Sequence, residues 1–279
     1  MSTEPDKVMS FTDHLQELRT RLKYALISVV VTMIIAYAFS DVLFVWLAQL
    51  LIAAWHAADL GTPKLHFANP IEPFFTYIKI SLLGGIFLSA PVLFYQLWAF
   101  IAPGLYRREK KYAIPFAMVS ALFFVGGACF GYFVVFPLGF QFFLGFAQLD
   151  MGSMHDVLGG ALSVSMKETF QIQPTLMMSE YLALVWRLLL GFGLIFELPL
   201  LIFFLTMAGV VTVGALWRFN RYFIIVAFVI SAALTPPDVV TQVFMAGPLV
   251  ILYNLSILVA FIVQRKKKEP DEAAPAPEE

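Results

Sequence analysis

Long apolar runs, separated by short charged segments, dominate the hydrophobic pattern of this 279-residue chain. The hydrocarbon core of a bilayer is about 30 Å thick and requires about 20 mostly apolar residues for each crossing helix. By this criterion we predict an all-α integral membrane protein with six transmembrane helices in a single domain of residues 1–263. The spans lie at about residues 23–40, 80–101, 112–136, 181–205, 222–234 and 239–263. The fifth run is short for a crossing and would need local thinning of the bilayer or a protein neighbour.

Two further apolar segments are predicted to be helices at the membrane surface. Before the first span, apolar residues recur three and four positions apart, which places them on one face of an amphipathic helix on the cytoplasmic side. Residues 42–58 are uncharged but end close to Trp55 and His56. We expect them to form an interfacial helix over the bundle, because a seventh span would reverse the distribution of charge described next.

The cations are distributed unevenly between the predicted loops, which indicates the orientation of the chain. Cytoplasmic loops are enriched in Lys and Arg. Fourteen of the 18 Lys and Arg residues lie before the first span, between the second and third, between the fourth and fifth, or after the sixth. Six crossings with both termini in the cytoplasm account for this pattern. Residues 264–279 begin with four consecutive cations and then become acidic and rich in Pro and Ala, which predicts a disordered cytoplasmic tail.

Composition and charge exclude several classes of protein. The chain is 60% hydrophobic and 13% charged, against about 45–50% and about 25% in soluble domains. The net charge of -1 provides no basic field to bind nucleic acid. Residues 36–38 (AYA) match a signal-peptidase site, but the segment before the apolar run is long and contains several acids. We therefore expect the first span to be retained rather than cleaved.

No catalytic or metal-binding motif is present in the sequence. HExxH, GxSxG, GxxxxGK[ST] and GxGxxG patterns are missing, and the four histidines are far apart. A single cysteine excludes an internal disulfide. We therefore predict no enzymatic activity, no metal and no cofactor.

Glu197 is the only acid inside a predicted span. A carboxylate there is unfavourable unless it is paired, protonated or hydrated, so it marks a functional site by default. Pro199 adds an irregularity, because it cannot donate a hydrogen bond to the carbonyl of Ile195. A proton site in a carrier of a small solute is one interpretation. A neutral, hydrogen-bonded glutamic acid that packs the bundle is the alternative.

Glu17 and Glu109 are the acids nearest to the membrane on the predicted cytoplasmic side. Two separated carboxylates could each bind a guanidinium through charge-assisted hydrogen bonds. Each also has a simpler explanation. Glu17 stands four residues before Arg21, the favoured orientation for a pair within one helix. Glu109 lies among four cations, at 107, 108, 110 and 111, and could merely offset their charge.

Prolines and glycines inside the spans predict the shape of the bundle and one of its contacts. Prolines such as Pro91, Pro115 and Pro199 kink or end helices, which is compatible with a curved, concave bundle. Gly127 and Gly131 form a small-xxx-small pair, the pattern typical of a helix-packing face.

Several motifs resemble those of the TatC family, the large multi-span subunit of the twin-arginine protein translocase. The likeness extends from about residue 8 to residue 263 and is most specific in the block that precedes Glu109. The matching segments are 14–19 (HLQELR), 89–91 (SAP), 95–106 (YQLWAFIAPGLY), 132–137 (YFVVFP), 196–199 (FELP) and 234–238 (LTPPD). Residues 148–180 are longer than we expect between the third and fourth spans, so the role of this external segment is not readable.

The resemblance implies a glove-shaped receptor in the bacterial inner membrane, with both termini cytoplasmic. It would bind the twin-arginine signal peptides of folded cargo proteins through its N-terminal helix and first cytoplasmic loop, with carboxylates at Glu17 and Glu109. The other residues expected at this site are Leu18, Arg19, Phe100, Pro103, Leu105 and Tyr106. Glu197 would face the concave side of the bundle.

The resemblance also implies partners and an energy source. TatA-type and TatB-type single-span subunits would contact the ends of the last two spans, at Thr235, Pro236, Asp238 and Gln242. We further expect self-association, and export driven by the proton-motive force. The competing hypothesis is a proton-coupled secondary transporter of a small solute that uses Glu197. No internal repeat of the kind found in many carriers is present.

Overall fold

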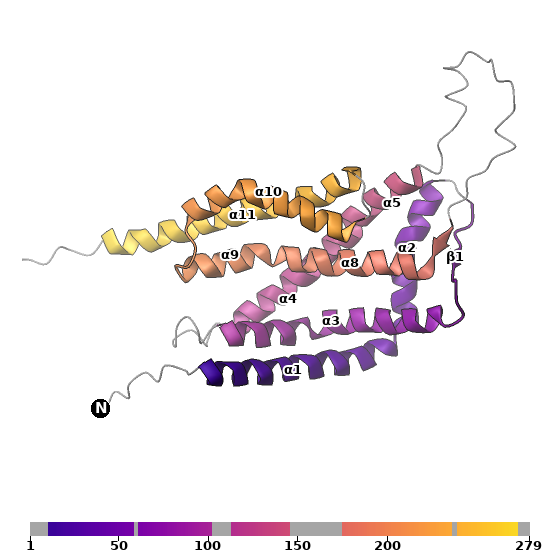
Figure 1. Ribbon diagram of the computed structural model, residues 1–279, viewed down its shortest axis with the longest axis horizontal. Helices are drawn as coiled ribbons and strands as arrows, with labels where there is room; N and C mark the ends of the chain where they lie inside the picture. Colours follow the sequence, from indigo (N-terminus) through magenta and orange to yellow (C-terminus); the bar gives the residue numbers. More distant parts are fainter. Residues whose placement is uncertain (1–10, 59–60, 102–112, 146–174, 236–238, 273–279) are drawn as a thin grey trace, which may run out of the picture.

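The structure, a computed structural model, describes residues 11–58, 61–101, 113–145, 175–235 and 239–272. Long helices make up nearly all of this part of the chain (Figure 1). The elements are α1 (Phe11–Tyr37), α2 (Ser40–Ala57), β1 (Leu65–His66), α3 (Glu72–Ile101), α4 (Ala113–Phe130), the π-helical turn η3 (Gly131–Val135), α5 (Phe136–Gly145), β2 (Leu176–Met177), α8 (Met178–Phe196), α9 (Leu198–Met207), α10 (Val213–Leu234) and α11 (Val239–Glu272).

The number of apolar helices differs from the prediction. Seven helices in the described part of the chain, rather than six, are long and apolar enough to cross a membrane. The additional one is α2, the segment that the charge pattern assigned to the interface. In Figure 1 α2 runs steeply across the direction shared by α1, α3 and α8. Length and hydropathy alone therefore do not separate a crossing helix from one that lies over the bundle.

Two chain ends depart from the predicted boundaries. The amphipathic segment and the first span form one continuous helix, α1, because neither Pro nor Gly interrupts residues 11–37. At the other end α11 continues through the cationic cluster to Glu272, where the sequence predicted disorder from residue 264, because Lys, Arg, Gln and Glu are good helix formers. The start of α1 and the end of α11 lie toward the same end of the bundle (Figure 1).

Close contacts through glycine hold neighbouring helices together. A Cβ at Gly85 of α3 would lie 2.8 Å from the backbone of Met33 in α1, and the Thr32 hydroxyl donates a 2.8 Å hydrogen bond to the Gly85 carbonyl. The pair Gly127 and Gly131 packs against Phe192 of α8, and a Cβ at Gly131 would approach the Phe192 ring to 2.9 Å. The predicted packing face is therefore confirmed.

The π-helical turn η3 directs Tyr132 toward α2. Pro137 has no N–H, so the carbonyl of Phe133 receives no i+4 hydrogen bond and the ladder widens here. The Phe136 N–H instead bonds to the carbonyl of Gly131. Tyr132 then stacks on Trp46, with ring centroids 4.0 Å apart.

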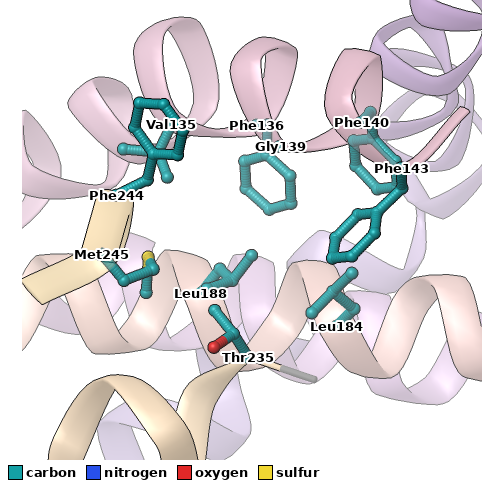
Figure 2. A pocket seen from close by; sticks show the side chains of 10 residues that line it. All are labelled: Val135, Phe136, Gly139, Phe140, Phe143, Leu184, Leu188, Thr235, Phe244 and Met245. Carbon is teal, nitrogen blue, oxygen red and sulfur yellow. The ribbon is translucent and has the colours of Figure 1, made fainter. Parts of the chain in front are cut away.

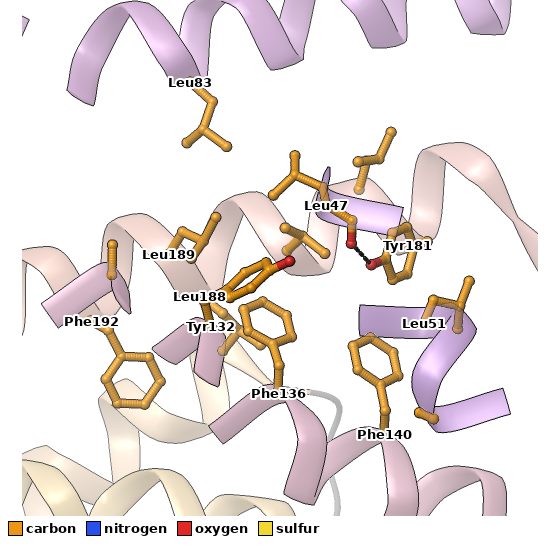
Figure 3. Packing of buried hydrophobic residues seen from close by; sticks show 14 of the residues in the cluster. Leu47, Leu51, Leu83, Tyr132, Phe136, Phe140, Tyr181, Leu188, Leu189 and Phe192 are labelled. Atoms are coloured by element: carbon orange, nitrogen blue, oxygen red, sulfur yellow. Dashed lines mark hydrogen bonds between the residues drawn. The ribbon is translucent and has the colours of Figure 1, made fainter. Parts of the chain in front are cut away.

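Tyrosine hydroxyls attach α2 to the rest of the bundle. Tyr132 donates to the carbonyl of Trp46, and Tyr181 of α8 donates to the carbonyl of Leu47, each at 2.6 Å. Figure 3 shows the second of these bonds within the main hydrophobic cluster, where Leu47 and Leu51 of α2 meet Phe136 and Phe140. Helix α2 is therefore an integral part of the core.

A polar link joins the starts of α3 and α8 at the same end of the molecule as the strand pair. The Glu72 carboxylate accepts hydrogen bonds from the N–H of Ser179 at 2.8 Å and of Ala68 at 2.9 Å. The first N–H groups of a helix have no acceptor within the helix. Glu72 supplies an acceptor to one of those of α8, the N–H of Ser179. Beside it, β1 pairs in parallel with β2, with Leu65 opposite Leu176.

Candidate functional site

The beginning of α1 and the end of α3 lie together at one end of the bundle. The His14 ring of α1 stacks on the Phe100 ring of α3, with centroids 4.4 Å apart and planes inclined by 17°. Glu17 follows His14 by three residues on α1, so this contact brings Glu17 close to the end of α3. Leu18 and Arg19 are both exposed on α1. The other expected members of this site, Pro103, Leu105, Tyr106 and Glu109, lie outside the described residues.

The carboxylate of Glu17 is paired with Arg21 of the same helix, as the simpler sequence interpretation expects. The Arg21 Nε–H donates to Oε1 of Glu17 at 2.9 Å, and Nη2 donates to the same oxygen at 2.5 Å. The second carboxylate oxygen, Oε2, is buried and has no hydrogen-bond partner in the described part of the chain. Oε1 therefore carries the whole ion pair, and the acceptor capacity of Oε2 is unused among the described residues.

A polar cavity of about 420 Å³ lies beside this pair. Of its seven lining residues only Glu17 was assigned to the site from the sequence, and the others are Gln16, Thr20, Arg21, Tyr24, Tyr95 and Gln96. Tyr95 and Gln96 come from α3, so only the packing of α1 on α3 brings them to Glu17. A glutamine near the end of an apolar span is the signal that could have identified Gln96.

Glu197 lies at the junction of α8 and α9, and Pro199 is the second residue of α9. Its carboxylate is hydrogen-bonded to the Ser120 hydroxyl of α4, and Ser120 also accepts a 2.7 Å hydrogen bond from Trp98 Nε1–H of α3. Oε1 of Glu197 is buried and unpaired among the described residues. One oxygen of Glu197 is therefore hydrogen-bonded, as expected for a glutamic acid that packs the bundle. The other oxygen has no donor among the described residues.

Ser231 and Gln242 hold α10 and α11 together where the two helices meet. The Ser231 hydroxyl of α10 donates to the carbonyl of Gln242 at 2.7 Å, and Gln242 Nε2 donates to the carbonyl of Phe228 at 3.0 Å. Thr235 Oγ1 donates to the carbonyl of Ser231 at 2.9 Å. Pro236 and Asp238 lie outside the described residues.

A second cavity, next to Thr235, is apolar and small. Figure 2 shows it lined by phenylalanines and other apolar side chains of η3, α5, α8 and α11, with the Thr235 hydroxyl among them. Its volume is about 30 Å³, the share of one water molecule in the liquid. It is too small for the solute of a carrier.

Among the described residues, no group of three or more His, Cys, Asp or Glu side chains could hold a metal ion. The α1–α3 end offers hydrogen-bond acceptors, namely the Glu17 carboxylate and the neutral amide and hydroxyl oxygens around it, rather than metal ligands or an activated nucleophile. This chemistry suits recognition of a cationic side chain.

Comparison with known proteins identifies closely similar chains. A family model described as Sec-independent protein translocase protein (TatC) matches residues 13–248. The protein of that name from Desulforapulum autotrophicum is 44% identical, over 98% of this chain and 92% of its own length. That from Aquifex aeolicus is 39% identical, over 95% of this chain and 100% of its own.

Solved structures give the same result. A crystal structure described as the twin-arginine translocase receptor TatC is similar over 90% of this chain and 99% of its own, with a TM-score of 0.71 and 36% identity. A second one, described as the same receptor in DDM, covers 88% of this chain and 99% of its own, with a TM-score of 0.73 and 37% identity.

Proposed function

Because the chain belongs to the TatC family of Sec-independent protein translocase proteins, we propose that it is the subunit that binds twin-arginine signal peptides of folded cargo at the α1–α3 site. It is a multi-pass membrane protein and a component of a protein translocase. The similarity to structures of the translocase receptor favours this function over a proton-coupled carrier. The observation that carries the proposal is the half-occupied carboxylate of Glu17 beside a polar cavity.

The chemistry of the site fits a guanidinium. A planar guanidinium presents several N–H donors in a fixed fork, and a carboxylate with a free oxygen accepts one of them with charge assistance. Glu17 supplies such an oxygen, and Glu109, from the loop after α3, supplies a second carboxylate for the second arginine. Leu18, which is 41% exposed, and Phe100 offer apolar surface to the residues that follow the arginines.

The proposed topology has six crossings, both termini in the cytoplasm and α2 lying along the external face of a concave bundle. Three observations support it. The cations gather on the loops of one side, the described ends of α1 and α11 lie toward the same end of the bundle, and α2 runs across the other helices while it is bonded to them by Tyr132 and Tyr181. The membrane is the bacterial inner membrane, as for the family.

The proposed partners are the small single-span TatA-type and TatB-type subunits. We place their contact at the ends of α10 and α11, around Thr235, Pro236, Asp238 and Gln242, and expect self-association and export driven by the proton-motive force. Glu197, whose buried Oε1 has no donor among the described residues, would offer an intramembrane acceptor on the concave side. These assignments rest on the family.

Site-specific crosslinking tests the receptor function. A photoreactive amino acid at Leu18 is expected to crosslink to a synthetic signal peptide that carries two consecutive arginines. Glu17→Gln and Glu109→Gln should each lower the yield about tenfold or more, because a charge-assisted hydrogen bond contributes about 1.5–3 kcal/mol. Crosslinking to the same peptide with two lysines should be weaker from the start.

A matched control comes from the opposite end of the bundle. Glu180 lies in the first turn of α8, and Glu180→Gln removes an equal charge without touching the α1–α3 site. Its crosslinking yield should equal that of the unmodified protein. If Glu17→Gln and Glu180→Gln gave the same yield, the assignment of the signal-peptide site would be wrong.

A further inference from the structure

Glu17 already binds a guanidinium, that of Arg21, before any peptide arrives. Both donors, Nε and Nη2, go to the single oxygen Oε1. The two side chains are only 19% (Glu17) and 23% (Arg21) exposed, so solvent screens this pair less than it screens a pair on an open surface. The carboxylate proposed for the cargo is therefore held by a residue of the receptor itself.

The resident pair leaves the carboxylate incompletely satisfied. Oε2 is buried without a partner in the described part of the chain, although a carboxylate can accept about four hydrogen bonds. A guanidinium that bound Glu17 through both oxygens would give each oxygen a donor, in the two-point geometry typical of strong arginine–carboxylate pairs. Arg21 does not adopt that geometry, so an incoming arginine can make a better pair than Arg21 does.

The cavity beside the pair provides room for the exchange. Its volume of about 420 Å³ is more than ten times the roughly 30 Å³ of one water molecule. Apart from Glu17 and Arg21, its lining residues carry neutral amides and hydroxyls that can accept hydrogen bonds from a guanidinium, those of Gln16, Thr20, Tyr24, Tyr95 and Gln96. A single carboxylate in this lining thus faces two candidate guanidiniums, and neutral acceptors are available to the one that is displaced.

We propose that Arg21 is an internal competitor for Glu17, which an arginine of the signal peptide displaces from the carboxylate when it binds. The inference rests on the proposed function of Glu17. Its consequence follows from linkage: the apparent affinity for the peptide equals the intrinsic affinity multiplied by the fraction of receptors in which the carboxylate is free. An internal competitor therefore weakens cargo binding below what the free carboxylate would give, which favours release of the signal peptide.

Binding of a fluorescent synthetic twin-arginine peptide to the full-length protein in nanodiscs tests this role. Arg21→Gln should bind the peptide about three- to tenfold more tightly than the unmodified receptor, because the carboxylate is then always free. Arg21→Lys, which keeps the charge but loses the two-donor contact, should give a smaller increase and serves as a second variant if Arg21→Gln does not fold. Unchanged or weaker binding in both variants would overturn the proposal.

Two controls separate displacement from a general effect of charge. Lys23→Gln removes a cation two residues further along α1 that makes no ion pair within the described residues, and it should leave the dissociation constant within about twofold. In a Glu17→Gln background, Arg21→Gln should no longer tighten binding. If Lys23→Gln tightened binding equally, or the effect of Arg21→Gln persisted without Glu17, Arg21 would not be a competitor for this carboxylate.

These measurements also distinguish failure of the inference from failure of the proposed function. If Glu17→Gln leaves peptide binding unchanged, the signal-peptide site itself is misplaced. If Glu17→Gln weakens binding while Arg21→Gln does not strengthen it, the site stands and only the competition by Arg21 is wrong.

Discussion

Polar residues inside the bundle are hydrogen-bonded in pairs and small networks, and Glu17 and Glu197 each keep one carboxylate oxygen without a partner among the described residues. Ser120 connects three helices, because it accepts from Trp98 of α3 and bonds to Glu197 between α8 and α9. Its side chain is completely buried, so no water replaces the hydroxyl when it is removed. The network therefore has one residue whose loss would leave two others without a partner.

Ser120→Ala tests this network at the scale of one residue. The substitution leaves the Trp98 N–H and the Glu197 carboxylate without their shared partner, and a buried unpaired polar group costs about 1–3 kcal/mol. The midpoint of thermal unfolding in detergent should fall accordingly. Ser256→Ala is the matched control, because Ser256 is equally buried but, among the described residues, its hydroxyl bonds only to the Leu252 carbonyl of its own helix. Equal midpoints for the two variants would show that the network adds nothing.

Pairs of helices approach each other through glycine faces. On α4, Gly127 faces α8, and a Cβ there would collide with the carbonyl of Phe192 and lie 2.8 Å from the Phe196 side chain. Its neighbour Gly126 has nothing within 4 Å of a Cβ. Adjacent positions on one helix thus differ completely in what surrounds them.

Gly127→Ala and Gly126→Ala form a matched pair of variants at the scale of the element. Gly127→Ala should destabilise the protein by about 1–3 kcal/mol, the usual cost of overpacking a closely packed contact. Gly126→Ala should be neutral or stabilising by up to about 1 kcal/mol, because alanine favours the helix. Unfolding of both variants in detergent measures the difference. A Gly127→Ala protein as stable as the Gly126→Ala protein would contradict the close α4–α8 contact.

At the scale of the whole molecule, the course of α2 decides the topology. Its length and hydropathy are those of a crossing helix, yet it lies across α1, α3 and α8 (Figure 1). If α2 lies along one face of the membrane, both of its ends are on the same side. If it crosses, they are on opposite sides.

Cysteine labelling in intact cells distinguishes these two arrangements. After Cys129→Ala removes the native thiol, Val42→Cys and His56→Cys place single thiols at exposed positions near the two ends of α2. We expect a membrane-impermeant reagent to label both from outside the cell. Arg265→Cys should be labelled only after the membrane is opened. Labelling of one α2 end from each side would establish seven crossings and exclude the proposed topology.

The sequence by itself determined the properties that add up locally along the chain. The hydropathy of a segment is the sum of the contributions of neighbouring residues, so the apolar runs identified a helical membrane protein. The small-xxx-small spacing identified the packing face of α4. The block before Glu109 identified the family. Glu17 and Arg21 could be paired from the sequence because four residues is one helical turn.

Only the tertiary structure decided the contacts between residues distant in the chain. Tyr95 and Gln96 reach Glu17 because α1 packs along α3, and Ser120 reaches Glu197 because α4 crosses α8. The course of α2 depends on the hydroxyls of Tyr132 and Tyr181, which bond to residues 86 and 134 positions away. Hydropathy records how apolar a segment is but carries no information about its direction or neighbours, since these depend on the shapes of all the packed helices together.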